Sequence, residues 1–452
     1  MKLINKFFWI SCLLLLFASC KKEEALNPTP PVGLGGETYA KGPVDTWLLD
    51  SLTTPYNIAV KYRWDPFELN NLDATLTPPE ESKVIPAMSA IKRVWIDPYN
   101  AETGSELFIK KYSPKQFVLV GSVQYNPNGT VLLGQAEDGN NIVFLDINQN
   151  FDQNNISSLQ RMIETSHHEF AHILHQTVMY PQEYKSINSN LSLPGYTGTW
   201  FNISEAEALS RGYITSYAMA TSDEDFVEMV ANMLMEGRTR FNEIVASTNP
   251  TAQQSLREKE QIVVTYFREV WDIDFYSLQS RVQAALYSLI PVPSVADAFG
   301  FNKTYTRALV DPADQVLLPQ PASFMTIFNN AKTGLANIAP GGRTLLAYTL
   351  AYDSETTIVL TFFYVNAAGA QLQGRFQYNI SKDAGNVYTF TLNGADANGN
   401  FIYPGVAPLV DYFSDNKYTI TWYADPGVSI YPRVKFTPQA TPGTYFIALL
   451  LQ

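Results

Sequence analysis

The sequence predicts an α+β chain in two folded parts, and three observations carry this prediction. Up to residue 289, short alternating apolar segments mix with longer ones whose apolar residues recur at three- and four-residue spacings. After Pro291-Val292-Pro293 the pattern changes to alternating runs separated by turn residues. The length of 452 residues also exceeds what one hydrophobic core usually holds. We therefore expect a domain of mixed sheet and helices over residues 43–292, and an all-β domain of the sandwich type over residues 293–452.

The first 42 residues have the features of an export signal followed by a linker. Lys2 and Lys6 precede an apolar run that ends near Ala18 and is too short to span a membrane. Phe17-Ala18-Ser19-Cys20 resembles a bacterial lipobox, whose cysteine becomes lipidated. We expect residues 1–19 to be a lipoprotein signal peptide, Cys20 to be the lipidation site, and residues 20–42 to be a flexible linker. A plain cleaved signal peptide with an incidental cysteine is the alternative.

The residues after Cys20 indicate where in the cell the protein is located. Lys21-Lys22-Glu23-Glu24 contains no aspartate next to the cysteine, and it resembles the export signal of surface lipoproteins in Gram-negative bacteria of the gut type. The acyl chains of one lipidated cysteine are enough for stable anchoring. This implies an outer-membrane protein that is lipid-anchored and faces the cell exterior.

Charge and cysteine content limit the partners and the kind of metal site. The net charge is −12, without a basic block beyond the N-terminus, which argues against nucleic acid as a partner. Cys12 lies in the segment predicted to be removed, so Cys20 is the one thiol expected to remain. We expect no disulfide, and any metal site must use histidine and carboxylate ligands.

The elements can be assigned in order along the chain. Strands are expected over residues 56–64, 117–125, 130–133 and 141–146, with a turn at 126–129. Helices are expected over 157–179, 205–220, 223–236, 251–270 and 274–289. The C-terminal part predicts strands at 344–350, 357–362 and 388–392, with turns at Asn393-Gly394 and Asn398-Gly399.

The histidines point to a metal site on the helix predicted at 157–179. All four histidines of the chain lie between His167 and His175, and the run from His168 to His172 reads H-E-x-x-H, the pattern of zinc hydrolases. Residues four apart on a helix share one face, so His168 and His172 can bind one tetrahedral ion. Glu169 lies about 100° further round the helix and can reach a water on the metal without being a ligand. A helix with merely packed or solvated histidines is the alternative.

Two histidines leave a catalytic zinc one protein ligand short. A metzincin would place histidine where Val178 stands, and no Asn-Glu dipeptide of the thermolysin kind follows at a suitable distance. Further on, Ser222 or Asp223 would cap a helix on which Glu224 and Glu228 stand one turn apart on the same face. One carboxylate can bind zinc while the other accepts the free N–H of a ligand histidine. The spacing does not decide which of Glu224 and Glu228 binds zinc and which contacts the histidine.

The order of these segments resembles the lethal-factor-like branch of the gluzincins. The motif from His168 to His172 is followed by Ser216-Tyr217 and then by Glu224-Asp225-Phe226-Val227-Glu228. The resemblance implies a gluzincin-like zincin fold, with Glu224 as the third zinc ligand and Tyr217 as a phenol that supports the transition state. It implies that Glu228 orients a ligand histidine. The alternative is that Glu228 binds the metal and Glu224 is a solvated residue of the helix start.

Residues from about 45 to 285 resemble more closely the lipoproteins called substrate import-associated zinc metallohydrolases. The shared segments are the two histidine and glutamate motifs together with Thr54-Pro55-Tyr56-Asn57-Ile58, Lys61-Tyr62-Arg63-Trp64 and Trp95-Ile96-Asp97-Pro98-Tyr99. That family is typically found beside TonB-dependent outer-membrane receptors and their surface lipoproteins, which implies partners of this kind. The C-terminal β part lies outside the resemblance.

These features predict a zinc-dependent hydrolase, most simply a peptidase, with one Zn²⁺ per chain and a peptide or protein substrate. Glu169 is the expected general base and Tyr217 the expected donor to the oxyanion. By analogy with gluzincins, the strand at 141–146 is expected to pair with an extended peptide. His175 lies two turns from His168 on the same face, which favours packing or support of a ligand histidine. Two alternatives remain: a non-catalytic binding lipoprotein of an import complex, and a zinc hydrolase of a non-peptide amide or ester.

Overall fold

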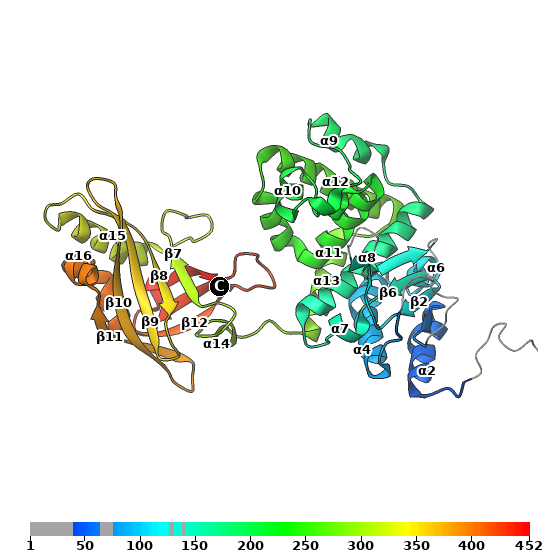
Figure 1. Ribbon diagram of the computed structural model, residues 1–452, viewed down its shortest axis with the longest axis horizontal. Helices are drawn as coiled ribbons and strands as arrows, with labels where there is room; N and C mark the ends of the chain where they lie inside the picture. The colour runs from blue at the N-terminus through cyan, green and yellow to red at the C-terminus, as the bar shows by residue number, and fades with distance from the viewer. Residues whose placement is uncertain (1–38, 64–75, 126–130, 133, 138–140) are drawn as a thin grey trace, which may run out of the picture. The chain divides into compact units, whose positions relative to one another are not determined.

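The computed structural model describes residues 39–63, 76–125, 131–132, 134–137 and 141–452 (Figure 1). The predicted signal peptide, Cys20, the predicted linker up to residue 38 and the predicted turn at 126–129 lie outside the described residues. Helices and a mixed sheet precede an antiparallel β region, so the α+β prediction is confirmed.

A four-stranded mixed sheet forms in the first part, in the order β1-β2-β6-β5. Strands β1 (Ala59–Lys61), β2 (Gln116–Leu119) and β6 (Asn141–Phe144) are parallel, and β5 (Gly134–Glu137) is antiparallel to β6. A separate hairpin pairs β3 (Gln124–Tyr125) with β4 (Val131–Leu132). The strand predicted from residue 56 starts later, because 54–56 is helical and Asn57 has a left-handed φ of 60°.

The strands on either side of β6 contradict the prediction that this strand pairs with a peptide. This strand lies between β2 and β5, so both of its edges already carry hydrogen-bonded partners. The prediction that residues 141–146 pair with a peptide is therefore wrong. In this sheet order β5 is the end strand beyond β6, and strand addition on that side of the sheet would take place there.

Helix α8 (Ile156–Thr177), which carries the histidines, is anchored at its start and along its back. The Asn155 side chain accepts a hydrogen bond from Ser158 N at 3.2 Å and so caps the helix. Phe170 lies edge-on to Trp95 and Tyr99, with both pairs of ring centroids 5.2 Å apart. This packing orients the opposite face of α8, the face of His168 and His172.

The other described helices up to residue 298 follow one another along the chain (Figure 1). They are α2 (Pro43–Leu48), α3 (Thr54–Tyr56), α4 (Glu81–Ile91), α5 (Asp97–Thr103), α6 (Leu107–Tyr112), α7 (Ile147–Asn150), α9 (Ile187–Asn190), α10 (Glu205–Ser210), α11 (Ser222–Ala246), α12 (Pro250–Trp271), α13 (Phe275–Leu289) and α14 (Val295–Ala298). Single helical turns are η1 (Leu49–Thr53), η2 (Lys92–Ile96), η3 (Gln182–Ser186), η4 (Trp200–Asn202) and η5 (Tyr217–Met219).

Two helix predictions need correction. The helix predicted at 205–220 ends at Ser210, because Gly212 has a φ of 80° and sits so close to Ser255 that a Cβ there would lie 2.8 Å from its Oγ. The helix predicted at 223–236 continues to Ala246, although Gly237 interrupts it with a φ of 71°. Its cap is Thr221, whose side chain accepts from Glu224 N at 3.2 Å; the expectation of Ser222 or Asp223 as the cap is wrong.

The C-terminal part is a closed antiparallel barrel, so the prediction of a sandwich is wrong while its antiparallel β character is confirmed. Its strands run in the closed order β10-β11-β12-β13-β14-β7-β8-β9. They are β7 (Arg307–Val310), β8 (Thr344–Tyr352), β9 (Thr357–Val365), β10 (Gln371–Lys382), β11 (Val387–Ala395), β12 (Lys417–Ala424), β13 (Arg433–Pro438) and β14 (Phe446–Leu451). Residue alternation cannot reveal closure, because it marks two faces of each strand without saying which strand pairs with which.

Two helices of this part, α15 (Ala322–Asn337) and α16 (Ala397–Ser414), were not predicted. The turns expected at Asn393-Gly394 and Asn398-Gly399 lie instead in β11 and in the first turn of α16. Asp396 caps α16 by accepting from Gly399 N at 2.5 Å, which explains why a turn-like sequence starts a helix. The core of this part is aromatic and includes Tyr348, Phe362, Tyr378, Phe390, Phe413, Tyr418 and Phe446.

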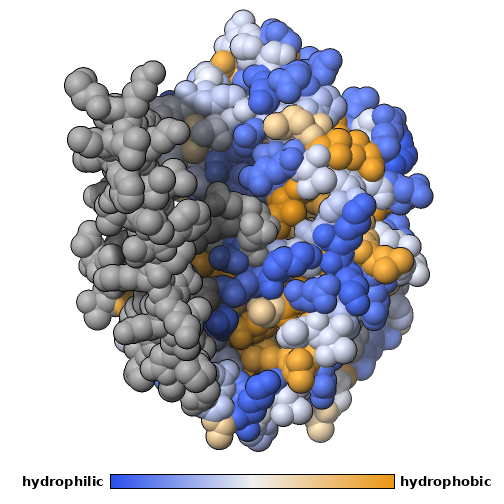
Figure 2. Space-filling view, turned by 90° about the vertical axis from the view of Figure 1, so that its right-hand side faces the viewer, coloured by the Kyte–Doolittle hydropathy of each residue, from blue (hydrophilic) through white to orange (hydrophobic). Residues whose placement is uncertain are grey.

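The face of the molecule drawn in Figure 2 is predominantly polar. Figure 2 shows one face on which hydrophilic residues surround separate hydrophobic patches. Within the described ranges, no helix combines the length and the apolar character needed to cross a membrane.

Candidate active site

Helix α8 brings three potential ligands together. One ligand atom each from His168, Glu169 and His172 lies within 4.8 Å of the others. His168 and Glu169 are buried, with exposed fractions of 8% and 7%, and His172 is partly buried. The four-residue spacing of the histidines on one helix face produces this cluster.

The first turn of α11 adds a carboxylate to the two imidazoles. Glu224 Oε2 lies 3.2 Å from His168 Nε2 and 3.3 Å from His172 Nε2. Four ligands at 2.0–2.1 Å around a tetrahedral zinc are separated from one another by about 3.3 Å. The carboxylate oxygen therefore lies from each imidazole nitrogen at the separation that zinc coordination requires, and this donor set of two imidazoles and a carboxylate fits the ion.

Glu228, one turn further along α11, contacts the other ring nitrogen of His168. Its Oε1 lies 2.7 Å from His168 Nδ1, and its Oε2 accepts from Thr215 Oγ1 at 2.6 Å. Thr215 Oγ1 in turn accepts from Ala218 N at 3.1 Å. This chain of contacts fixes the ring of His168 with Nε2 turned toward Glu224. No sequence signal indicated Thr215, because it lies in the irregular segment before η5.

His175 contacts His172 in a similar way. Its Nε2 lies 3.0 Å from His172 Nδ1, on the ring side away from the contact with Glu224. The side chain is buried, and burial together with the positive charge of His172 lowers the pKa of His175 to about 4. A neutral His175 can accept a hydrogen bond at Nε2 from the N–H group of His172 Nδ1.

Charge in the site favours a cation. Burial raises the pKa of the Glu224 carboxyl, but its contacts with His168 and His172 outweigh burial and hold that pKa well below its usual range. Burial lowers the pKa of His168, and Glu224 and Glu228 more than reverse this. Burial and the negative charges of Glu228 and Glu236 raise the pKa of Glu164, one turn before His168, to about 8. Glu169, Glu224 and Glu228 place three carboxyl groups beside the imidazoles of His168 and His172, which suits a divalent ion.

Tyr217 stands beside the imidazole pair at the start of η5. Its ring lies 5.9 Å from that of His168 and nearly parallel to it, and 36% of the residue is exposed. Burial of the phenol and the negative charge of Glu224 raise the pKa of Tyr217 above its usual value. Glu205, another residue without a sequence signal, accepts from Ser216 N at 2.9 Å and from Ser216 Oγ at 2.6 Å, which holds the chain entering η5.

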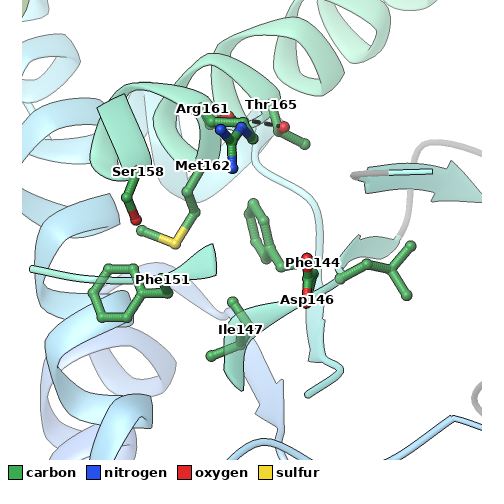
Figure 3. A pocket seen from close by; sticks show the side chains of 9 residues that line it. Phe144, Asp146, Ile147, Phe151, Ser158, Arg161, Met162 and Thr165 are labelled. Carbon is green, nitrogen blue, oxygen red and sulfur yellow. Dashed lines mark hydrogen bonds between the residues drawn. The ribbon is translucent and has the colours of Figure 1, made fainter. Parts of the chain in front are cut away.

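A small pocket lies between side chains of the first half of α8 and side chains of residues 144–151 (Figure 3). Its volume is about 30 Å³, and Thr165, one turn before His168, lies at its edge and donates to Arg161 O at 3.1 Å. The remaining lining residues are Phe144, Leu145, Asp146, Ile147, Phe151, Ser158 and Met162. This space is large enough to hold ordered water.

Comparison with known proteins adds two similarities. Residues 37–276, more than half of the 452-residue chain, match a family described as "putative zinc-binding metallo-peptidase". A crystal structure of a "putative zinc-binding metallo-peptidase" from Bacteroides caccae is similar at 28% sequence identity and a TM-score of 0.47, over 54% of this chain and 92% of that chain. No curated protein matches the sequence. The matched residues include α8 and α11.

Proposed function

The chain belongs to the family of zinc-binding metallo-peptidases that its residues 37–276 match, and on this premise we propose that it is a zinc-dependent peptidase with one catalytic ion per chain. The observation that carries the proposal is the position of Glu224 Oε2, within 3.3 Å of Nε2 of both His168 and His172. The substrate is a peptide or protein.

The ligands in this proposal are His168, His172 and Glu224. Glu228 accepts a hydrogen bond from the Nδ1–H group of His168 and so orients the ring of this ligand. The alternative with Glu228 as the ligand has less support, because Glu228 approaches Nδ1 and leaves Nε2 to Glu224. A bound zinc ion would polarise the scissile carbonyl and make a water molecule more acidic.

The remaining residues would move protons and orient the substrate. Glu169, beside the two histidines, takes the proton of the attacking water and passes it to the leaving amine. Tyr217 keeps its phenol proton because its pKa is raised, and it donates to the developing oxyanion. An extended peptide would pair with the end strand β5, antiparallel neighbour of β6. These roles correspond to a lethal-factor-like gluzincin.

We further propose that the protein is an outer-membrane lipoprotein anchored through Cys20 and exposed at the cell surface. The supporting residues are Phe17-Ala18-Ser19 before the cysteine and Lys21-Lys22-Glu23-Glu24 after it. A TonB-dependent receptor and its lipoprotein partner are the proposed neighbours. Metabolic labelling with a fatty acid tests the anchor: label should enter the wild type and not Cys20→Ala.

The experiment that tests the enzymatic proposal compares the zinc-loaded full chain, in detergent, with its Glu169→Gln variant. Both digest a diverse peptide mixture, mass spectrometry reads the products, and metal analysis measures zinc in both. We expect equal zinc, with cuts made only by the wild type. Equal zinc with no cuts by either protein would contradict a peptidase and favour a non-catalytic binding role or a non-peptide amide or ester as substrate.

A further inference from the structure

Three aromatic side chains form a continuous ledge that leads outward from the metal-ligand cluster. The Tyr217 ring lies 5.9 Å from that of His168, the Trp200 ring lies 4.8 Å from Tyr217, and the Phe201 ring lies 5.9 Å from Trp200. Tyr217 and Phe201 are 36% and 37% exposed, and Trp200 is partly exposed. We call Trp200, Phe201 and Tyr217 the aromatic ledge. Exposed apolar surface gathered beside a reaction centre indicates binding.

The ledge is held in place by backbone hydrogen bonds. Thr197 N donates to Met219 O at 2.8 Å, which joins the segment before η4 to η5. Ile203 N donates to Trp200 O at 2.9 Å and closes the turn that carries Trp200 and Phe201. Because this surface is already ordered, a ligand can bind to it without the loss of entropy that ordering a loop would bring.

We infer that the aromatic ledge is a subsite for an aromatic side chain of the peptide substrate, close to the scissile bond. Trp200 is tilted by 63° against Tyr217, and Phe201 by 84° against Trp200. Rings at these angles form a corner in which another aromatic ring packs edge-to-face. A flat platform of parallel rings, which would suit the broad face of a sugar, is not what these angles produce.

The ledge lies within reach of residues that flank the cleaved bond. The two ring-to-ring steps from His168 to Trp200, 5.9 and 4.8 Å, place the indole at most about 11 Å from the imidazole. An extended peptide advances about 3.3 Å per residue, so the indole can select a side chain within about three residues of the scissile bond. The inference rests on the proposed peptidase function for the nature of the ligand.

The test measures binding and does not depend on turnover. Zinc-loaded Glu169→Gln protein is titrated by fluorescence anisotropy with labelled peptides that carry Phe or Ala at each of three positions on either side of a central bond. Phe at one position should strengthen binding about tenfold over Ala, the magnitude expected for aromatic packing together with partial burial of the ring. Adding Trp200→Ala should remove that preference, and Trp200→Phe should retain most of it.

The matched control is Phe401→Ala in the same background, because Phe401 is an exposed aromatic residue (46%) of α16. The control should keep the tenfold preference. No preference for Phe in the parent, or a preference that survives Trp200→Ala, would overturn the subsite. Competition by neutral oligosaccharides, with no discrimination among peptides, would overturn the choice of an aromatic side chain as the occupant.

The outcomes separate this inference from the proposed function. If wild-type protein cuts peptides but Glu169→Gln protein does not discriminate Phe from Ala, the peptidase stands and the subsite fails. If Phe is preferred through Trp200 but the wild type cuts nothing, the subsite stands as a binding site and the peptidase fails.

Discussion

Lys259 Nζ lies 2.7 Å from Asp225 Oδ2, both side chains are fully buried, and Asp225 directly follows the proposed zinc ligand Glu224 in the chain. Tyr196 also donates to Asp225 Oδ2, at 3.1 Å, and Lys259 Nζ donates to Gly212 O at 2.8 Å. This buried pair connects the first turn of α11 to α12 and to the chain at Gly212. It therefore helps to fix the position of Glu224, the neighbour of Asp225 in that turn.

Removing one partner of this pair should be strongly destabilising. Lys259→Met leaves the Asp225 carboxylate buried without its cation, which costs about 3–5 kcal/mol in the free energy of unfolding. Urea denaturation measures the change. The matched control is Arg268→Met, whose partner Glu269 lies 3.4 Å away with both side chains more than 60% exposed; its effect should stay within about 0.5 kcal/mol. Equal effects of the two substitutions would show that the buried pair has no special role.

The two carboxylates of α11 should contribute unequally to zinc affinity. Glu228→Ala should weaken zinc binding about 10–100-fold, the usual effect of losing the group that orients a ligand histidine. Glu224→Ala should weaken it considerably more, because it removes a ligand. Thr215→Val should cause a smaller loss than Glu228→Ala, since it removes the hydrogen bond to Glu228 Oε2.

Competition with a fluorescent chelator measures these affinities. Glu258→Ala, at a partly exposed position of α12, serves as the control and should leave zinc affinity unchanged. If Glu228→Ala weakened zinc binding more than Glu224→Ala, the assignment of the third ligand would have to be reversed.

His167 should make the protein less stable as the pH falls below 6.5. Burial lowers the pKa of this fully buried imidazole to about 3, whereas the unfolded chain takes up the proton near pH 6.5. Below pH 6.5 the unfolded state therefore binds more protons, and stability that is present at higher pH is lost as the pH falls toward 3. Between pH 7 and pH 5 this amounts to about 2 kcal/mol.

The measurement is the free energy of unfolding at pH 7 and at pH 5 for the wild type and for His167→Gln. The variant lacks the titrating group, so its loss of stability over this interval should be smaller by about 2 kcal/mol. The same loss in both proteins would mean that His167 takes up its proton in the folded state as readily as in the unfolded state.

Gln283 should stabilise the break in α11. Gly237 leaves the helical conformation there, and Gln283 Nε2 donates to Leu234 O at 2.7 Å and to Met235 O at 2.8 Å. Gln283→Ala leaves these carbonyls without that donor and should cost about 1–3 kcal/mol in the free energy of unfolding. Gln254→Ala, at a site where the amide pairs with Glu258 near the surface, should have little effect. Similar urea midpoints for Gln283→Ala and the wild type would contradict this role.

Much of the helical part could be predicted from the sequence, and the reason is local. The helix with His168 and His172 was expected over 157–179 and forms over Ile156–Thr177, because its cap and its apolar spacing involve residues within a few positions of one another. The end expected at residue 236 marks the point at which Gly237 breaks α11, again a property of one residue.

The predictions that failed depended on contacts between distant residues. The helix expected over 205–220 stops early because Gly212 packs against Ser255 of α12, and the β part closes into a barrel because of strand pairings that alternation does not encode. In the same way, the free edge expected at 141–146 is occupied by β5, whose residues have no strong strand pattern.

The sequence by itself determined that this chain carries H-E-x-x-H on a helix and two acidic residues one turn apart on another, since both are spacings along a single helix. The tertiary structure alone decided that Glu224 faces Nε2 of both histidines while Glu228 faces Nδ1 of His168. It also decided that Trp200 stands beside Tyr217. These relationships join residues from separate elements, and the packing of those elements determines the distances between them.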